Sequence, residues 1–298
     1  MSKSAILSSS IAKKYWMALT GLFLCLFLVG HLLGNLQLIL KTGEEGRRAF
    51  NEYAYFMTHN PLIKVMSYLT YLSILFHAID GILLAIQNKK ARPVSYAYNN
   101  PGANSSTFAR QMAVLGSAIL IFIVIHMSNF WWKMKYSSDP MPLHKVMVKD
   151  PQSGQEQGLY VTQTDNFLPT SAFENTPMGE AQMEIKNGTE FHNKQVKVKM
   201  GEGYKDLHSL TVAFFGQDKS EYSPIFKAND KALFAVILYV LAMAVLSFHL
   251  MHGFSSAFQS LGLNHKRYMP GITLFGKLFA VLVPLAFALI PIIIFLNK

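Results

Sequence analysis

Residues 16–40 read WMALTGLFLCLFLVGHLLGNLQLIL, a long apolar run with a histidine, His31, well inside it. About 20 mostly apolar residues are enough to cross a bilayer as a helix. Four further runs of this kind follow, at approximately 63–88, 110–135, 231–259 and 272–296. The first run is longer than the apolar part of a signal peptide and lacks a small-residue cleavage site. The sequence therefore predicts an all-α membrane protein, a bundle of five transmembrane helices.

The basic residues gather at the ends of the apolar runs rather than in a stripe between aromatic residues. The net charge is +10, but this distribution argues against nucleic acid as a partner and indicates a lipid bilayer. The short loop at about 41–60 balances its basic residues with acidic ones. By the positive-inside rule, by which short cytoplasmic loops are enriched in Lys and Arg, the N-terminus lies in the cytoplasm and, after five spans, the C-terminus lies outside. The residues that decide this are Lys3, Lys13, Lys14, Lys89, Lys90, Arg92, Arg110, Lys266 and Arg267.

Residues 137–230 differ from the rest of the chain because they are polar, rich in proline and contain no apolar run. A loop of this length is uncommon without structure of its own. The alternating stretches at 195–200 and 210–215 predict short strands. We therefore expect three parts: residues 1–136 with a polar N-terminal segment and helices one to three, a β-rich periplasmic insertion at 137–230, and residues 231–298 with helices four and five.

Four histidines lie in four different apolar runs: His31, His77, His126 and His249. An ionisable side chain is costly inside a bilayer and points to function. At 1.5 Å per helical residue, His31 and His126 lie roughly 22 and 24 Å from the cytoplasmic ends of their runs, whereas His77 and His249 lie nearer the cytoplasmic face. This grouping predicts two bis-histidine metal centres, an outer one and an inner one.

Glycines at repeated offsets accompany these histidines. Gly21 and Gly116 precede the histidines of their runs by ten residues, and Gly81 and Gly253 follow theirs by four. A glycine near a ligand histidine leaves room for a flat macrocycle. The only cysteine, Cys25, lies in an apolar run and no C-x-x-C-H motif exists, so any haem would be of the b type. Two imidazoles fill both axial positions and favour electron transfer over oxygen chemistry, so we expect two haem b groups packed against the four glycines.

Alternative interpretations of the histidines remain open. His252 lies one turn after His249 and competes with it for the inner haem, although depth and the glycine offset favour His249. A histidine in a span also forms simple interhelical hydrogen bonds, and zinc is a further metal, against which the depth separation of the two pairs argues. The remaining histidines fall in predicted loops, where we expect them to be solvated: His59, His144, His192, His208 and His265.

The motifs around the four histidines resemble a known family, the five-helix, two-haem cytochrome b membrane subunits of bacterial succinate:menaquinone oxidoreductases and quinol:fumarate reductases. The resemblance covers all five apolar runs. It is carried by Ala18-Leu19-Thr20-Gly21 leading to Gly30-His31, by Phe76-His77-Ala78 with Gly81, by Gly116 leading to His126, by Phe248-His249 with Gly253, and by Leu261-Gly262. One feature departs from the family, because residues 137–230 replace a connection that is short there.

The resemblance implies that His31 and His126 hold the outer haem and that His77 and His249 hold the inner one. It also implies a location in the bacterial inner membrane, with a flavoprotein subunit and an iron–sulfur subunit bound on the cytoplasmic face. The chain has no flavin or iron–sulfur motif, so it would not oxidise succinate alone but would pass electrons to or from menaquinone. The direction of catalysis and the role of the insertion stay open.

Three further residues are weaker candidates for proton transfer or quinone binding, and two other functions remain possible from the sequence. Asp80 is an intramembrane acid suited to proton transfer, and the resemblance puts Ser10 and Lys14 near a quinone site at the inner face. Another two-haem cytochrome b subunit, of a hydrogenase or nitrate reductase, shares the same histidine pattern. A metal-free transporter with a histidine proton relay is the alternative from a different class.

Overall fold

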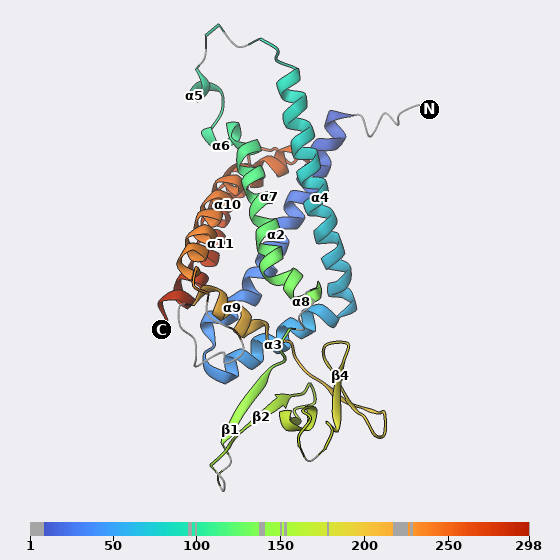
Figure 1. Ribbon diagram of the computed structural model, residues 1–298. Helices are drawn as coiled ribbons and strands as arrows, with labels where there is room; N and C mark the ends of the chain where they lie inside the picture. Colours follow the sequence, from blue (N-terminus) through green and yellow to red (C-terminus); the bar gives the residue numbers. More distant parts are fainter. Residues whose placement is uncertain are drawn as a thin grey trace, which may run out of the picture. The chain divides into compact units, whose positions relative to one another are not determined.

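The computed structural model describes residues 9–94, 97–98, 100–136, 141–149, 151, 154–177, 179–216, 226 and 229–297. The first eight residues of the predicted N-terminal segment, Lys3 among them, and Pro140 of the insertion lie outside this part. The chain divides into two compact units (Figure 1). Unit 1 comprises Met1–Leu36, Pro61–Ile125 and Lys231–Asn297, and unit 2 comprises Gln37–Asn60 and His126–Asp230 with the last residue.

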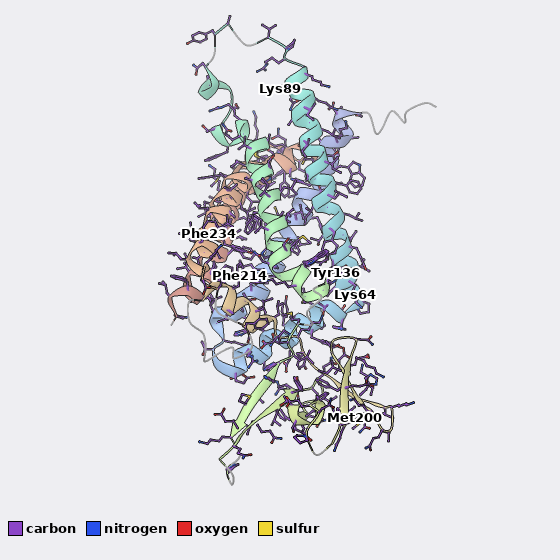
Figure 2. All side chains as sticks on the ribbon, viewed as in Figure 1. Lys64, Lys89, Tyr136, Met200, Phe214 and Phe234 are labelled. Carbon is purple, nitrogen blue, oxygen red and sulfur yellow. The ribbon has the colours of Figure 1, made fainter. Side chains whose placement is uncertain are left out.

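Among the described residues, five helices are long and apolar enough to cross a membrane, as predicted. They are α2 (Ser10–Leu40), α4 (Pro61–Lys90), the continuous segment Met112–Tyr136, α10 (Ala232–Ser260) and α11 (Met269–Leu296). Lys64 and Lys89 lie near the two ends of α4 (Figure 2), a separation of about 38 Å along the axis. Lipid requires every backbone polar group to be satisfied within the segment, and a helix does this alone.

The segment Met112–Tyr136 is not uniform. It consists of α7 (Met112–Met127), a π-helical turn η1 (Ser128–Trp132) and α8 (Lys133–Tyr136). Before it, two short helices, α5 (Pro101–Asn104) and α6 (Thr107–Arg110), occupy part of the predicted turn-rich link. A π-helical turn inside an α-helix is uncommon and often marks a functional site; here it follows the predicted ligand His126 by two residues.

Helices α10 and α11 pack side by side within unit 1 (Figure 1). Their buried cluster contains Leu250, Phe254, Phe279 and Ala280, joined by Cys25 of α2. A Cβ added at Gly276 would lie 2.6 Å from a ring carbon of Phe254. Glycine at this position therefore allows the close approach of the two helices.

Unit 2 contains the predicted insertion and a helix that the sequence analysis did not predict. Residues 41–60, expected as a loop, form α3 (Gly43–His59). Glu44 and Glu45 lie in its first turn, where their negative charges stabilise the helix through its dipole. One face of the helix, with Arg47, Phe50 and Asn51, is buried. The loop prediction was wrong because the polar residues that suggested it are bonded inside unit 2.

Two three-stranded antiparallel sheets account for the predicted β character of residues 137–230. The first sheet has the order β1 (Lys145–Lys149), β2 (Glu156–Val161), β3 (Phe167–Pro169), and the second β4 (Met183–Lys186), β5 (Glu190–Asn193), β6 (Lys199–Glu202), with a bulge at Phe191/His192. A 3-10 turn, η2 (Thr170–Phe173), follows β3. The core joins the two sheets through Leu143, Met183 and Phe191.

The strand predicted at 210–215 is wrong, because these residues belong to helix α9 (Leu207–Phe215). The helix is buried on nearly all sides, which masks the one-sided periodicity that identifies a surface helix. Asp206 caps its N-terminus, and its carboxylate accepts a hydrogen bond from the backbone N–H of Ser209 at 3.1 Å. The strand predicted at 195–200 is confirmed only in its last two residues, at the start of β6.

Candidate functional site

His77 on α4 and His249 on α10 face one another within unit 1. Their ring centroids lie 6.2 Å apart, and the ring planes are inclined by 70°. Both side chains are half-buried, at levels where the two helices are apolar. The two residues predicted to form the inner pair are thus brought together, although they lie 172 positions apart in the sequence. Their role as ligands stays a prediction.

Two glycines of other helices lie against these rings. A Cβ built on Gly21 of α2 would lie 3.2 Å from Cε1 of His77, and one built on Gly116 of α7 would lie 3.6 Å from Cε1 of His249. The sequence pattern associates these glycines with His31 and His126, but the structure places them at the other pair. Gly21 and Gly116 therefore belong to the surroundings of His77 and His249.

The other two predicted glycines occupy equivalent places one turn away. A Cβ on Gly81 would lie 3.6 Å from Cε of Met17, and one on Gly253 would lie 3.9 Å from Cε of Met112. On this side the glycines meet flexible thioether side chains rather than imidazoles.

These contacts reveal an internal repeat in unit 1. The segment Met17-Ala18-Leu19-Thr20-Gly21 of α2 matches Met112-Ala113-Val114-Leu115-Gly116 of α7. In each copy the glycine contacts the histidine, and the methionine contacts the glycine, of an H-x3-G segment on a second helix. The methionines were missed by the sequence analysis, although the shared pattern M-A-x-x-G was a signal that could have found them.

Thr20 is a second residue near the site that the sequence analysis did not single out. Its side chain is 7% exposed. The hydroxyl donates to the carbonyl of Trp16 at 2.7 Å, and its oxygen lies 3.2 Å from Nδ1 of His77. Which of the two atoms donates depends on the tautomer of His77. In the tautomer that carries its proton on Nδ1, the Thr20 oxygen accepts that proton and Nε2 keeps its lone pair, the form in which an imidazole binds a metal.

His252 is oriented differently from His249. Its Nε2 lies 3.1 Å from Oγ of Ser256 on the same helix. Of these two histidines, it is His249 whose ring faces His77. This placement agrees with the preference drawn from depth and from the glycine offset.

The predicted outer pair is distributed over the two units. His31 of α2 belongs to unit 1, where its ring packs against Phe27 at 5.3 Å and against Phe287 at 5.6 Å between centroids. The side-chain amide of Asn35 donates to the carbonyl of His31 at 2.8 Å and lies 3.4 Å from its Nδ1. His126 begins unit 2, with its ring 5.4 Å from Phe130. The pairing of His31 with His126 stays a prediction.

The three weaker candidates lie on α2 and α4. Ser10 is the first residue of α2, and Lys14 follows one turn later; both side chains are exposed. Asp80 is half-buried on α4, three residues after His77 and therefore on a similar face.

Unit 2 contains a buried polar cluster around Asp206, in which two histidines predicted to be solvated take part. Arg47 donates from Nε at 3.1 Å and from Nη2 at 2.6 Å to one carboxylate oxygen of Asp206, and Asn51 donates to the other at 2.9 Å. His144, fully buried, contacts Glu44 through Nε2 and Asn51 through Nδ1. The solvated prediction was wrong for His144 and for His208, because tertiary packing buries both.

The charges of this cluster shift its pKa values. Burial works to raise the pKa of the Asp206 carboxyl, but the bonds and charge of Arg47 hold it below its ordinary value. Burial lowers the pKa of His208 to about 4, and its buried Nδ1 has no hydrogen-bond partner among the described residues. The cluster joins α3 to α9 and to the start of the first sheet, so its role is to hold unit 2 together.

Comparison with known protein families, with curated proteins and with solved structures gives no match for this chain.

Proposed function

We propose that the chain is the haem b-containing membrane anchor of a succinate dehydrogenase or fumarate reductase complex. In this role it transfers electrons between a cytoplasmic flavoprotein and iron–sulfur module and menaquinone in a bacterial inner membrane. The observation that carries the proposal is the pair of facing imidazoles, His77 and His249, with a glycine against each ring.

The spacing of the two rings fits one metal bound between them. Two imidazole nitrogens that bound one metal at about 2 Å each would put the ring centroids roughly 6 Å apart. The observed separation is 6.2 Å. A simple hydrogen bond between two imidazoles is the competing account, and the haem content of the purified chain separates the two.

The number of ligands favours haem over zinc. Within the part of the chain that the structure describes, no three side chains of His, Cys, Asp or Glu come together as a metal site. A zinc site needs three or four protein ligands, whereas a haem iron needs only axial ligands from the protein. Two imidazoles are therefore sufficient for haem b and insufficient for zinc.

The surroundings of the pair suit electron transfer. A bound haem b would supply a one-electron couple, and iron held by both His77 and His249 would leave no position for oxygen. His77 and His249 would hold the iron, Thr20 would keep the proton of His77 on Nδ1, and Gly21 and Gly116 would leave room for the flat group. The two imidazoles lie on helices α4 and α10, both of which are apolar enough to cross a membrane.

The proposal extends to a second haem and to the partner subunits. His31 and His126 would hold the outer haem, so that two haems form a ladder between a cytoplasmic electron partner and quinone within the membrane. The N-terminus would lie in the cytoplasm, the C-terminus in the periplasm, and the insertion at 137–230 on the periplasmic side. The flavoprotein and iron–sulfur subunits follow from the family resemblance.

The test uses the chain purified from membranes together with its bound partners. Pyridine haemochrome analysis should give two b-type haems per chain. His77→Ala and His249→Ala should each remove the same haem, while His265→Ala, in the turn before α11, should remove neither. A wild-type value near zero would overturn the proposal.

The electron donor distinguishes the family from its alternatives. Succinate should reduce at least one haem, and a menaquinone analogue should reoxidise it. Haems that respond to hydrogen or nitrate but not to succinate, fumarate or quinol would identify the other cytochrome b class. A protein without haem that moves protons would identify the transporter.

A further inference from the structure

The internal repeat of unit 1 is broken at one position that lies against the imidazole pair. Thr20 in the segment Met17–Gly21 corresponds to Leu115 in the segment Met112–Gly116. Both residues immediately precede the glycine that contacts a histidine ring. One copy of the repeat therefore offers a hydroxyl beside the site, and the other offers only hydrocarbon.

The two imidazoles differ in their hydrogen bonding as a result. Nδ1 of His77 lies 3.2 Å from the hydroxyl oxygen of Thr20. Nδ1 of His249 is buried and has no hydrogen-bond partner within the described part of the chain. Of the two rings, it is therefore His77 that has a polar side chain at Nδ1 within the described residues.

We propose that Thr20 is a positioning residue that makes the two axial ligands of the inner haem unequal. Thr20 does not contact the metal. Its oxygen accepts the Nδ1 proton of His77, which fixes the tautomer and the ring orientation and makes Nε2 a stronger donor. A stronger donor favours the oxidised iron, so Thr20 lowers the midpoint potential of the inner haem. This inference rests on the proposed function.

The repeat supplies a matched set of variants for the test. Thr20→Val keeps the shape of the side chain and removes the hydroxyl, and Thr20→Ser keeps the hydroxyl. Leu115→Thr puts a hydroxyl at the equivalent position beside His249. The measurements are redox titration of the inner haem, followed by absorbance, and the low-spin haem signal in electron paramagnetic resonance, both on the intact complex.

Thr20→Val should raise the midpoint potential, and Leu115→Thr should lower it. We expect each shift in midpoint potential to be about 59 mV. Hydrogen bonds to metal ligands have 10–100-fold effects, and a tenfold change in the relative stability of oxidised and reduced iron corresponds to 59 mV for one electron. Thr20→Ser should stay near the wild-type value. Loss of haem in Thr20→Val that Thr20→Ser restores would also support the role of the hydroxyl.

Two outcomes would overturn the inference, and both can be distinguished from a failure of the proposed function. If Thr20→Val retains haem with an unchanged potential and an unchanged low-spin signal, Thr20 does not act on the ligand. If Thr20→Val does not assemble, an unchanged potential in Leu115→Thr has the same consequence. A wild-type complex without haem would instead overturn the proposed function, and this inference with it.

Discussion

Gly21→Ala tests directly whether the glycines of the repeat make room for the imidazole pair. The added Cβ would lie 3.2 Å from Cε1 of His77, closer than ordinary contact, so the ring would have to move by a few tenths of an ångström. Overpacking of this kind costs about 1–3 kcal/mol, offset by up to about 1 kcal/mol from the better helix propensity of alanine. The equivalent Gly116→Ala puts its Cβ 3.6 Å from Cε1 of His249, an ordinary contact, so this imidazole would not have to move.

The assay compares the two variants in the intact complex. Gly21→Ala should be less stable than Gly116→Ala to thermal unfolding in detergent by about 1–3 kcal/mol, and its inner haem should be lost or spectrally altered. Equal behaviour of the two variants would refute the reasoning, because the helix-propensity term is the same and only the contact to the imidazole differs. Gly30→Ala, with nothing within 4 Å of its Cβ, is the control on the same helix.

Three further predictions concern unit 2 and the choice of ligand. Asp206→Asn leaves the buried charge of Arg47 without its main partner and should lower the stability of unit 2 by about 3–5 kcal/mol, measured by hydrogen exchange of the α9 amides. The double variant with Arg47→Met should lose less stability than the sum of the two single changes. The pKa of His208 falls from its ordinary 6.5 to about 4 on folding, so unfolding takes up a proton between these pH values, and unit 2 should lose up to about 3 kcal/mol of stability as the pH falls through this window. His208→Leu should remove that part of the pH dependence, and an unchanged pH profile would contradict the assignment. His249→Ala should abolish the inner haem spectrum and His252→Ala should preserve it, and the reverse result would transfer the ligand role to His252.

The membrane-spanning helices could be read from the sequence because their determinants are local. A run of apolar residues satisfies its backbone within itself as a helix, whatever surrounds it. The fourth predicted run, 231–259, differs from α10 (Ala232–Ser260) by one residue at each end. The strands of unit 2 were predicted only in general, since short strands depend on partners elsewhere in the chain.

Burial by tertiary packing explains the predictions that failed. Residues 41–60 read as a charged loop, but Arg47 is buried against Asp206, 159 positions away. His144 and His208 read as solvated for the same reason, since a polar residue in a polar stretch gives no local sign that a distant helix covers it. Residues 210–215 alternate like a strand, yet α9 is enclosed on nearly all sides.

The sequence by itself predicted that His77 and His249 lie at similar depth in two long apolar helices, because depth follows from counting residues along a helix of fixed rise. Only the tertiary structure decided what lies beside them. Depth and offset associate Gly21 with its own helix's histidine, whereas helix packing places it against His77. The position of the Thr20 hydroxyl, and the lack of a partner for Nδ1 of His249 among the described residues, follow from the same packing. The rotation of a helix about its axis is set by side chains on that helix and on its neighbours, so neither segment alone predicts it.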